Sequence, residues 1–346
     1  MMHPWLEDTW RRLVSLGERM PHALLFVGPA GTGKRDLADA LAAAMLCAHP
    51  TEDGHACGRC DACLLRLSGN HPDLHLLVPA AQSASPEASS AEEGGKAKSS
   101  QIVIEQVRDL QSALGVTAHQ GSRRVVIVEP AEAMNTFTAN ALLKSLEEPP
   151  QGCTFLLCSS APRMLLPTIR SRCQTWAISP PDETALRAWA TDKPPELLAL
   201  ARAGGGMPLA AERLAARGMA PHLMRFVRDI GALPGTDPLM LAGQWESWLK
   251  SKEAIAAGFD MAQLVDWVQR WVTDLTSIRL GGQVRYFPDH EAVLSAVALR
   301  AKVDAMTTCY NDLTRIRRVA RHPLNARLML EDMLLRFARA IGGIKR

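Results

Sequence analysis

The sequence lacks a long hydrophobic run and a leader that would direct the chain out of the cell. No stretch approaches the roughly 18 apolar residues of a membrane-spanning helix. The opening segment MMHPWLEDTWRRLV carries early acidic residues and no uninterrupted apolar core, unlike a signal peptide. We therefore expect a cytoplasmic protein with no membrane partner, in a compartment where thiols stay reduced.

An excess of charge of one sign is also missing. The net charge is +3 over 346 residues, which is too small to indicate nucleic-acid binding by itself. The hydrophobic fraction of 47% and the charged fraction of 22% are those of an ordinary globular protein. The length is sufficient for two or three domains, each with its own core.

A phosphate-binding loop is present. The segment GPAGTGKR, residues 28–35, matches the first seven positions of the signature G-x-x-x-x-G-K-[ST]. The apolar run at 22–28 predicts a strand, and the spacing at 35–48 predicts a helix. Strand, glycine-rich turn and helix together aim a helix N-terminus at an anion. The candidate nucleotide-contacting residues are Gly28, Gly31, Thr32, Gly33 and Lys34.

Two features that metal-dependent hydrolysis needs are absent. The hydroxyl that closes the loop and binds Mg²⁺ is replaced by Arg35, which has no lone pair for a metal. The strand predicted at 123–130 ends in Glu129 followed by Pro130, where a hydrolysing enzyme has adjacent acids. We therefore expect no ATP turnover, and any ATP binding is expected to be weak or structural.

Four of the eight cysteines gather in residues 47–63. Two C-x2-C steps share Cys60, and four soft ligands so close in sequence suit a closed tetrahedral Zn²⁺ site. The sequence predicts structural zinc on Cys47, Cys57, Cys60 and Cys63. A histidine could replace one of these thiols, and the candidates are His49, His55 and His71. Small core residues are predicted at Cys153, Cys158, Cys173 and Cys309.

The composition divides the chain into three predicted domains. Residues 80–100 are rich in Ala, Ser, Gly and Glu, which predicts a flexible insertion within an α/β domain at 1–178. A small helical lid is predicted at 179–218, and amphipathic segments predict an α-helical bundle over 219–346. Core or subunit contacts are predicted for Leu324, Leu328, Met333 and Phe337. A solvated or subunit-facing surface, with DNA contact as the alternative, is predicted for Arg315, Arg317, Arg318 and Arg321.

Several motifs in order carry a resemblance to a known family. With GPAGTGK, the CxxCxxC module, HPDLH, ANALLKSLEEPP, TFLLCSS and TIRSRCQ, the chain resembles the bacterial clamp-loader subunits of DNA polymerase III. The resemblance is strong before residue 210 and weak after it. It implies an α/β AAA+ P-loop domain with a small helical lid and an all-α C-terminal collar domain that holds the ring of subunits together.

Within that family the chain resembles the delta prime branch more than the gamma/tau motor branch. Motor subunits have a hydroxyl after the loop lysine, adjacent acids and a lid arginine, whereas this chain has Arg35, Glu129-Pro130 and Pro208. The resemblance implies a subunit that is not an enzyme on its own. Its implied partners are the gamma/tau and delta subunits, with the sliding clamp and primer-template DNA reached through the complex during replication.

The resemblance also assigns a role to the SRC motif, which consists of Ser171, Arg172 and Cys173. In delta prime subunits the arginine of this motif acts as a finger on a neighbouring ATPase site. The planar fork of a guanidinium suits the oxygens of a γ-phosphate as charge develops there. Arg170 lies two residues away and is the alternative finger.

Two other functions remain open from the residues. The chain could be a gamma/tau-like motor that hydrolyses ATP despite the substitutions, or a zinc-containing nucleic-acid-binding module with a vestigial P-loop. Mg²⁺-dependent ATPase activity of the pure chain would indicate the motor. Binding to nucleic acid that weakens steeply with salt would indicate the zinc module.

Overall fold

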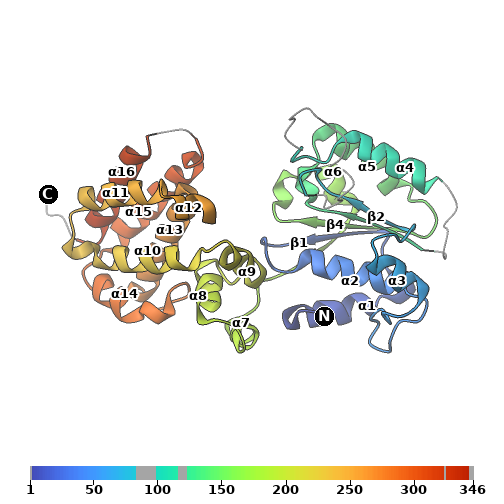
Figure 1. The fold of residues 1–346 in the computed structure, drawn as a ribbon, viewed down its shortest axis with the longest axis horizontal. Helices are drawn as coiled ribbons and strands as arrows, with labels where there is room; N and C mark the ends of the chain where they lie inside the picture. The colour runs from blue at the N-terminus through green and yellow to red at the C-terminus, as the bar shows by residue number, and fades with distance from the viewer. Residues whose placement is uncertain (1, 83–98, 116–122, 323–324, 343–346) are drawn as a thin grey trace. The chain divides into compact units, whose positions relative to one another are not determined.

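The computed structural model describes residues 2–82, 99–115, 123–322 and 325–342. The chain forms two compact units, Met1–Pro180 and Pro181–Arg346, each with its own hydrophobic core (Figure 1). Most of the insertion predicted at 80–100 lies outside the described residues. Within the described ranges, no helix is both long and apolar enough to span a membrane.

A parallel five-stranded sheet forms the centre of the first unit, with strand order β2-β3-β4-β1-β5. All residues of β3 and β4 are buried, which explains why these strands appear in the sequence as continuous apolar runs. In the register, Leu24 of β1 lies opposite Leu156 of β4 on one side and Gln174 of β5 on the other. The strands are β1 (Ala23–Val27), β2 (Leu74–Leu77), β3 (Arg124–Val128), β4 (Cys153–Ser159) and β5 (Gln174–Ala177).

Helices cover both faces of this sheet (Figure 1). Leu24 and Phe26 of β1 pack with α1 and α2, whereas Leu25 points to the opposite face and packs with α4 and α5. This alternation along the strand gives the unit two cores, one on each face. The helices are α1 (Glu7–Val14), α2 (Lys34–Leu46), α3 (Asp61–Leu67), α4 (Ile104–Leu114), α5 (Thr136–Glu147) and α6 (Pro167–Arg172).

The second unit is helical throughout its described residues. An aromatic cluster fills its centre, where the ring of Phe226 lies 5.5 Å from Trp267 and 6.0 Å from Phe287 between centroids. The helices are α7 (Glu183–Ala190), α8 (Pro195–Ala203), α9 (Pro208–Ala216), α10 (Ala220–Ala232), α11 (Pro238–Leu249), α12 (Lys252–Ala257), α13 (Met261–Arg279), α14 (Glu291–Ala298), α15 (Val303–Val319) and α16 (Ala326–Ala340). Residues of α7–α9 share one core with the later helices, so the predicted lid–collar boundary at 218/219 stays a prediction.

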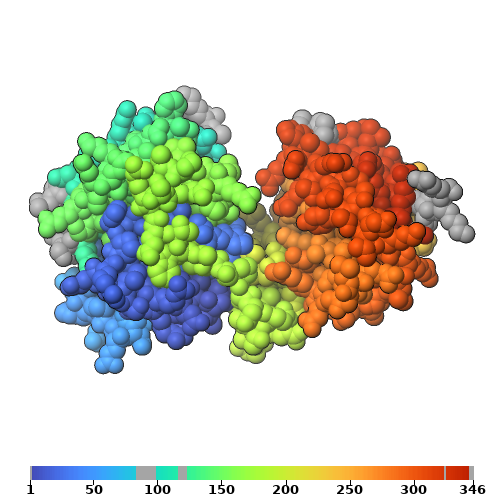
Figure 2. All heavy atoms as spheres, turned by 180° about the vertical axis from the view of Figure 1, so that it is seen from behind, coloured from blue at the N-terminus to red at the C-terminus, as the bar shows by residue number. Residues whose placement is uncertain are grey.

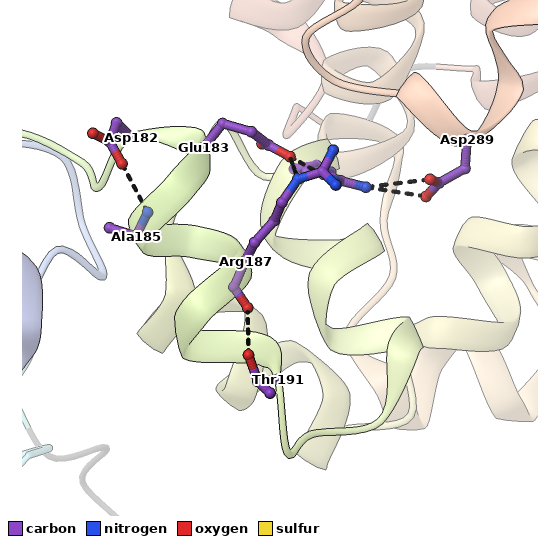
Figure 3. A network of polar contacts seen from close by, with 7 residues as sticks. Asp182, Glu183, Ala185, Arg187, Thr191 and Asp289 are labelled. Atoms are coloured by element: carbon purple, nitrogen blue, oxygen red, sulfur yellow. Dashed lines mark hydrogen bonds and ion pairs between the residues drawn. The ribbon is translucent and has the colours of Figure 1, made fainter.

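An ion-pair network around a buried arginine of α8 joins α7 and α8 to the segment before α14, and Figure 3 shows its members Glu183, Arg187 and Asp289. The Arg202 side chain is 4% exposed, and its Nη1 lies 3.2 and 3.3 Å from the two carboxylate oxygens of Asp289. Its Nη2 pairs with Glu183, which also accepts from Arg187 at 2.7 Å. Although partial burial opposes it, these hydrogen bonds hold the pKa of Glu183 below its ordinary value. A buried guanidinium needs such partners, because burying an unpaired charge would lower the stability of the folded state by several kcal/mol.

The predicted architecture, an α/β P-loop domain followed by helices, is confirmed. The predicted strands at 22–28 and 123–130 correspond to β1 and β3. In the last predicted helix, Met333 and Phe337 are buried, Leu328 is 62% exposed, and Leu324 lies outside the described residues.

Candidate functional site

The loop at 28–35, which the sequence predicts to bind phosphate, links β1 to α2. Gly31 and Gly33 have φ angles of 88° and 90°, in the left-handed region that favours glycine, and Gly33 is the N-cap of α2. A Cβ on Gly28 would lie 2.1 Å from the carbonyl oxygen of Ile178. The three glycines are therefore required by the backbone, and the loop has the shape that directs a helix N-terminus at an anion.

The polar side chains of the loop bind the loop itself. Lys34 is 6% exposed, and its Nζ donates to the carbonyl oxygens of Gly28 and Pro29, both at 2.8 Å. The Thr32 hydroxyl donates to the carbonyl of Pro29 at 3.0 Å. A phosphate entering the loop would have to compete with these two carbonyls for the ammonium group of Lys34.

Arg35 occupies the position at which a hydroxyl would bind Mg²⁺. Its Nη1 lies 3.1 Å from Oε2 of Glu129, the acid that directly follows β3, and its Nε lies 2.8 Å from Oδ2 of Asp39. Burial alone would lower the pKa of Arg35, but Asp39 and Glu129 together outweigh burial and raise it. The two positions that handle the metal in a hydrolysing enzyme are thus joined to each other by an ion pair.

The next acid after β3 is also engaged elsewhere. Oε1 of Glu132 accepts a hydrogen bond from the backbone N–H of Ser160 at 3.0 Å, just after β4. Glu132 lies in the short helical turn Ala131–Ala133 and not directly after Glu129. It therefore does not supply the adjacent acid that would orient an attacking water.

Two residues near the N-terminus contact the loop, and the sequence reasoning did not identify them. Nε1 of Trp5 donates to the carbonyl oxygen of Thr32 at 2.9 Å. His3 stacks on Trp5 at 4.7 Å between ring centroids, and its Nε2 lies 3.4 Å from Oδ2 of Asp36. The proline in His3-Pro4-Trp5 begins the short helix Pro4–Leu6, which is the local signal that could have drawn attention to the segment.

The SRC motif lies at the end of α6, at the surface of the first unit. Arg172 pairs with Glu147 of α5 and donates through Nη1 to the carbonyl of Thr168 at 3.0 Å. Ser171 is exposed, and Cys173 is buried, with its pKa raised to about 11 by burial. Arg170 is exposed, and no side-chain hydrogen bond or ion pair of Arg170 is found in the described part of the chain.

The four clustered cysteines come together as predicted. The sulfur atoms of Cys47, Cys57, Cys60 and Cys63 all lie within 4.8 Å of one another, and those of Cys47 and Cys60 are 3.9 Å apart. Four thiolates at about 2.3 Å from one Zn²⁺ in a tetrahedron would lie about 3.8 Å apart, so the donor set fits this metal. Such a set has no open position for catalysis.

Backbone N–H groups support the cluster. The amide of Cys57 donates to Sγ of Cys47 at 3.2 Å, and amides of Cys63 and Ala48 lower the pKa of Cys60 to about 6. Burial instead raises the pKa of Cys63 to about 12. A bound Zn²⁺ would hold all four sulfurs as thiolates.

The histidines considered as replacement ligands have other contacts or lie at the rim. His55 stacks on Trp10 at 4.5 Å between ring centroids, and Nδ1 of His71 accepts from the amide of Asp73 at 3.1 Å. His49 lines the hollow beside the cluster. Among the described residues the group with metal-ligand geometry consists of the four thiols. The remaining cysteines are buried, as predicted.

Comparison with known proteins gives consistent matches. A family model described as DNA polymerase III, delta subunit, matches residues 7–182, and one described as DNA polymerase III, delta subunit, C terminal, matches residues 237–339. The chain is 42% identical to DNA polymerase III subunit delta' of Pseudomonas aeruginosa over 237 residues, which are 67% of each chain. It is 29% identical to the Haemophilus influenzae subunit of that name over 97% of this chain and 96% of that one.

One solved structure aligns with nearly the whole chain, but at a low TM-score and low sequence identity. The gamma subunit-related protein of DNA polymerase III from Thermotoga maritima aligns over 97% of this chain and 99% of that chain, with a TM-score of 0.42 and 17% identity. The family assignment therefore comes from the sequence matches, and they confirm the resemblance inferred from the motifs.

Proposed function

This chain belongs to the DNA polymerase III delta prime family, and we propose that it acts as the non-hydrolysing delta prime subunit of a clamp loader. In this role its partners are the gamma/tau and delta subunits. The sliding clamp and primer-template DNA are contacted through the assembled complex. The chain is a structural member of the assembly and supplies one catalytic side chain, and hydrolysis takes place on the neighbouring subunits.

The ion pair of Arg35 with Glu129 is the observation that best supports the non-hydrolysing role. A guanidinium carries a positive charge to the place where Mg²⁺ would stand, but it cannot coordinate phosphate oxygens or water as a metal does. Pro208 at the start of α9 adds a further loss, because it stands where the family's lid arginine would be. ATP bound in this loop would have neither its metal nor its lid contact.

Arg172 is the proposed finger, acting in trans on a nucleotide held by an adjacent subunit. Its position at the end of an α6 helix fixed by the buried Ile169 allows the guanidinium to project from the surface. Glu147 holds it in the isolated chain, and a γ-phosphate with developing charge would replace that carboxylate as partner. Ser171 and Cys173 flank and position the arginine: the Ser171 hydroxyl donates to the carbonyl of Thr168 at 3.1 Å within α6, and Cys173 is the buried C-cap of that helix. Arg170 is the second candidate finger.

The four thiols are proposed to hold a structural Zn²⁺. The segment between α2 and α3 has few buried apolar side chains, and a metal would fix its path where packing cannot. Gly58 lies between two of the ligands with a φ of 71°, a turn that suits a C-x2-C metal loop.

The non-hydrolysing role is tested by the ATPase activity of the purified chain with Mg²⁺ and with a chelator. We expect no Mg²⁺-dependent turnover above the background of the preparation. Lys34→Ala serves as the control, because a contaminating ATPase is indifferent to that change. Turnover that needs Mg²⁺ and disappears in Lys34→Ala would contradict the proposal and indicate a motor subunit.

A further inference from the structure

We propose that the second unit carries a binding site for the phosphodiester backbone of a nucleic acid, in a hollow where α9, α12 and α15 end and α13 begins. The hollow encloses about 620 Å³ and is lined by Arg217, Arg317, Arg318 and Arg321 together with Asp260 and Asp266. The surface of this unit seen in Figure 2 is formed largely by the later, orange to red segments, to which α15 belongs. The hollow and the six charged residues that line it are called the arginine hollow.

Three of the four guanidiniums in the arginine hollow are available to a ligand. Arg317 pairs with Asp266 at 2.6 Å. For Arg217, Arg318 and Arg321, all exposed, no carboxylate lies within ion-pair distance among the residues that the structure describes. They come from two separate segments, the C-cap of α9 and the region around the end of α15, so their meeting is a product of the fold.

The two carboxylates of the hollow do not cancel this charge. Asp266 is neutralised by Arg317, and Asp260 is the N-cap of α13, where its Oδ1 accepts from the amide of Gln263 at 2.8 Å. A carboxylate bound to a helix N-terminus faces the positive end of the helix dipole, which screens it. Four guanidiniums against two carboxylates leave the hollow with a net charge of +2, which attracts an anion.

The lining favours a phosphate chain over an acidic peptide. Apart from the aliphatic stems of the arginines, only Leu214 and Ala262 contribute apolar side chains, and no aromatic ring is present among the described lining residues. Peptide partners usually bring an apolar anchor that fills a pocket, and this hollow offers none. Without an aromatic platform, bases have nothing to stack on, so binding should depend on phosphates and not on sequence. Guanidinium forks suit phosphate oxygens.

The test compares two triple variants of the full chain. Arg217→Gln, Arg318→Gln and Arg321→Gln together remove the available charge of the hollow. Arg228→Gln, Arg279→Gln and Arg315→Gln remove the same charge from exposed positions of the same unit outside the hollow. Circular dichroism checks that both variants are folded. The probes are fluorescein-labelled single strands of about 20 thymidines and of the matching uridines, measured by anisotropy over a salt series.

We expect the slope of log affinity against log salt to fall by about 2 in the hollow variant, because each phosphate contact in a single strand contributes about 0.7. Binding at about 50 mM salt should weaken roughly tenfold, while the control variant retains most of the affinity. A loss of affinity in the hollow variant for either the DNA or the RNA strand supports the site, and the strand that is affected shows which nucleic acid it binds. Equal affinities and slopes in all three proteins would overturn it, as would an arginine-dependent binding of polyglutamate without a matching effect on either strand.

Discussion

The ion pair between Arg35 and Glu129 leads to a prediction about Mg²⁺. In Arg35→Thr, a hydroxyl returns to the position that ligates Mg²⁺, and Glu129 loses its guanidinium partner. The local charge of Arg35, Asp39 and Glu129 changes from −1 to −2, counted as one cation and two carboxylates before and two carboxylates after. We therefore expect the variant to bind ADP or ATP more tightly with Mg²⁺ than with a chelator, whereas the wild-type chain should not distinguish the two conditions.

The magnitude follows from the distances and the exposure. At an effective dielectric of about 20, a pair of unit charges about 4 Å apart interacts by about 4 kcal/mol. The side chains of Arg35 and Glu129 are 30% and 31% exposed, so solvent reduces this to about 1–2 kcal/mol for the pair. Mg²⁺ should then improve nucleotide affinity in Arg35→Thr by about tenfold. Turnover should remain absent, because Pro130 still replaces the second acid and Pro208 the lid arginine.

The assay is a titration of a fluorescent nucleotide analogue with and without Mg²⁺. Arg19→Thr provides the matched control, since it makes the same change at an exposed position of the same unit away from the loop. Equal Mg²⁺ responses in the wild-type chain, Arg35→Thr and Arg19→Thr would show that the guanidinium does not determine metal use at this site, and the reasoning would fail.

Two further predictions concern zinc and acid. Purified protein should contain about one Zn²⁺ per chain, and Cys60→Ser should lower the zinc content and unfold the segment around α3. Cys309→Ser is the control, which should keep the metal. Zinc-free wild-type protein from a chelator-free preparation would contradict this prediction. The depressed pKa of Glu183 stabilises the folded state above the carboxyl's ordinary pKa, and this contribution is lost as pH falls through the lower, folded value. Glu183→Gln should therefore reduce the loss of unfolding free energy at acid pH, measured by denaturant unfolding at a series of pH values. An unchanged pH dependence would rule out a contribution of Glu183 to acid unfolding.

The central strands of the first unit and the loop before α2 could be predicted because their signals are local. The apolar runs of β1, β3 and β4 reflect strands buried on both faces, and the loop before α2 requires glycines at fixed positions. The cysteine cluster was predictable for the same reason, since all four ligands lie within residues 47–63. In each case the residues that interact are close in the sequence or follow a periodic pattern.

The partners of individual side chains could not be predicted in this way. Arg35 and Glu129 are 94 positions apart, and only the parallel order of β1, β4 and β3 brings them together. From the sequence, Arg202 would be expected to be an exposed charged residue of a helix, but its side chain is 4% exposed and pairs with Asp289. Leu328 fits the apolar spacing of α16 but is exposed. Periodicity indicates a face of a helix, and the identity of what covers that face depends on the tertiary structure.

The central claim is that Arg172 acts on a neighbouring subunit, and the most direct measurement is the DNA- and clamp-stimulated ATPase of a reconstituted complex. An arginine finger contributes roughly 10³–10⁵ to the rate at its own site. Arg172→Ala should therefore silence one site, while the complex as a whole loses less because its other sites keep their own arginines. Arg172→Lys should rescue little, since an ammonium lacks the bidentate fork. Arg170→Ala, the same change on the same helix, should leave the rate unchanged. A wild-type rate with Arg172→Ala in a complex shown to be intact would contradict the account, and loss of activity in Arg170→Ala alone would assign the finger to Arg170.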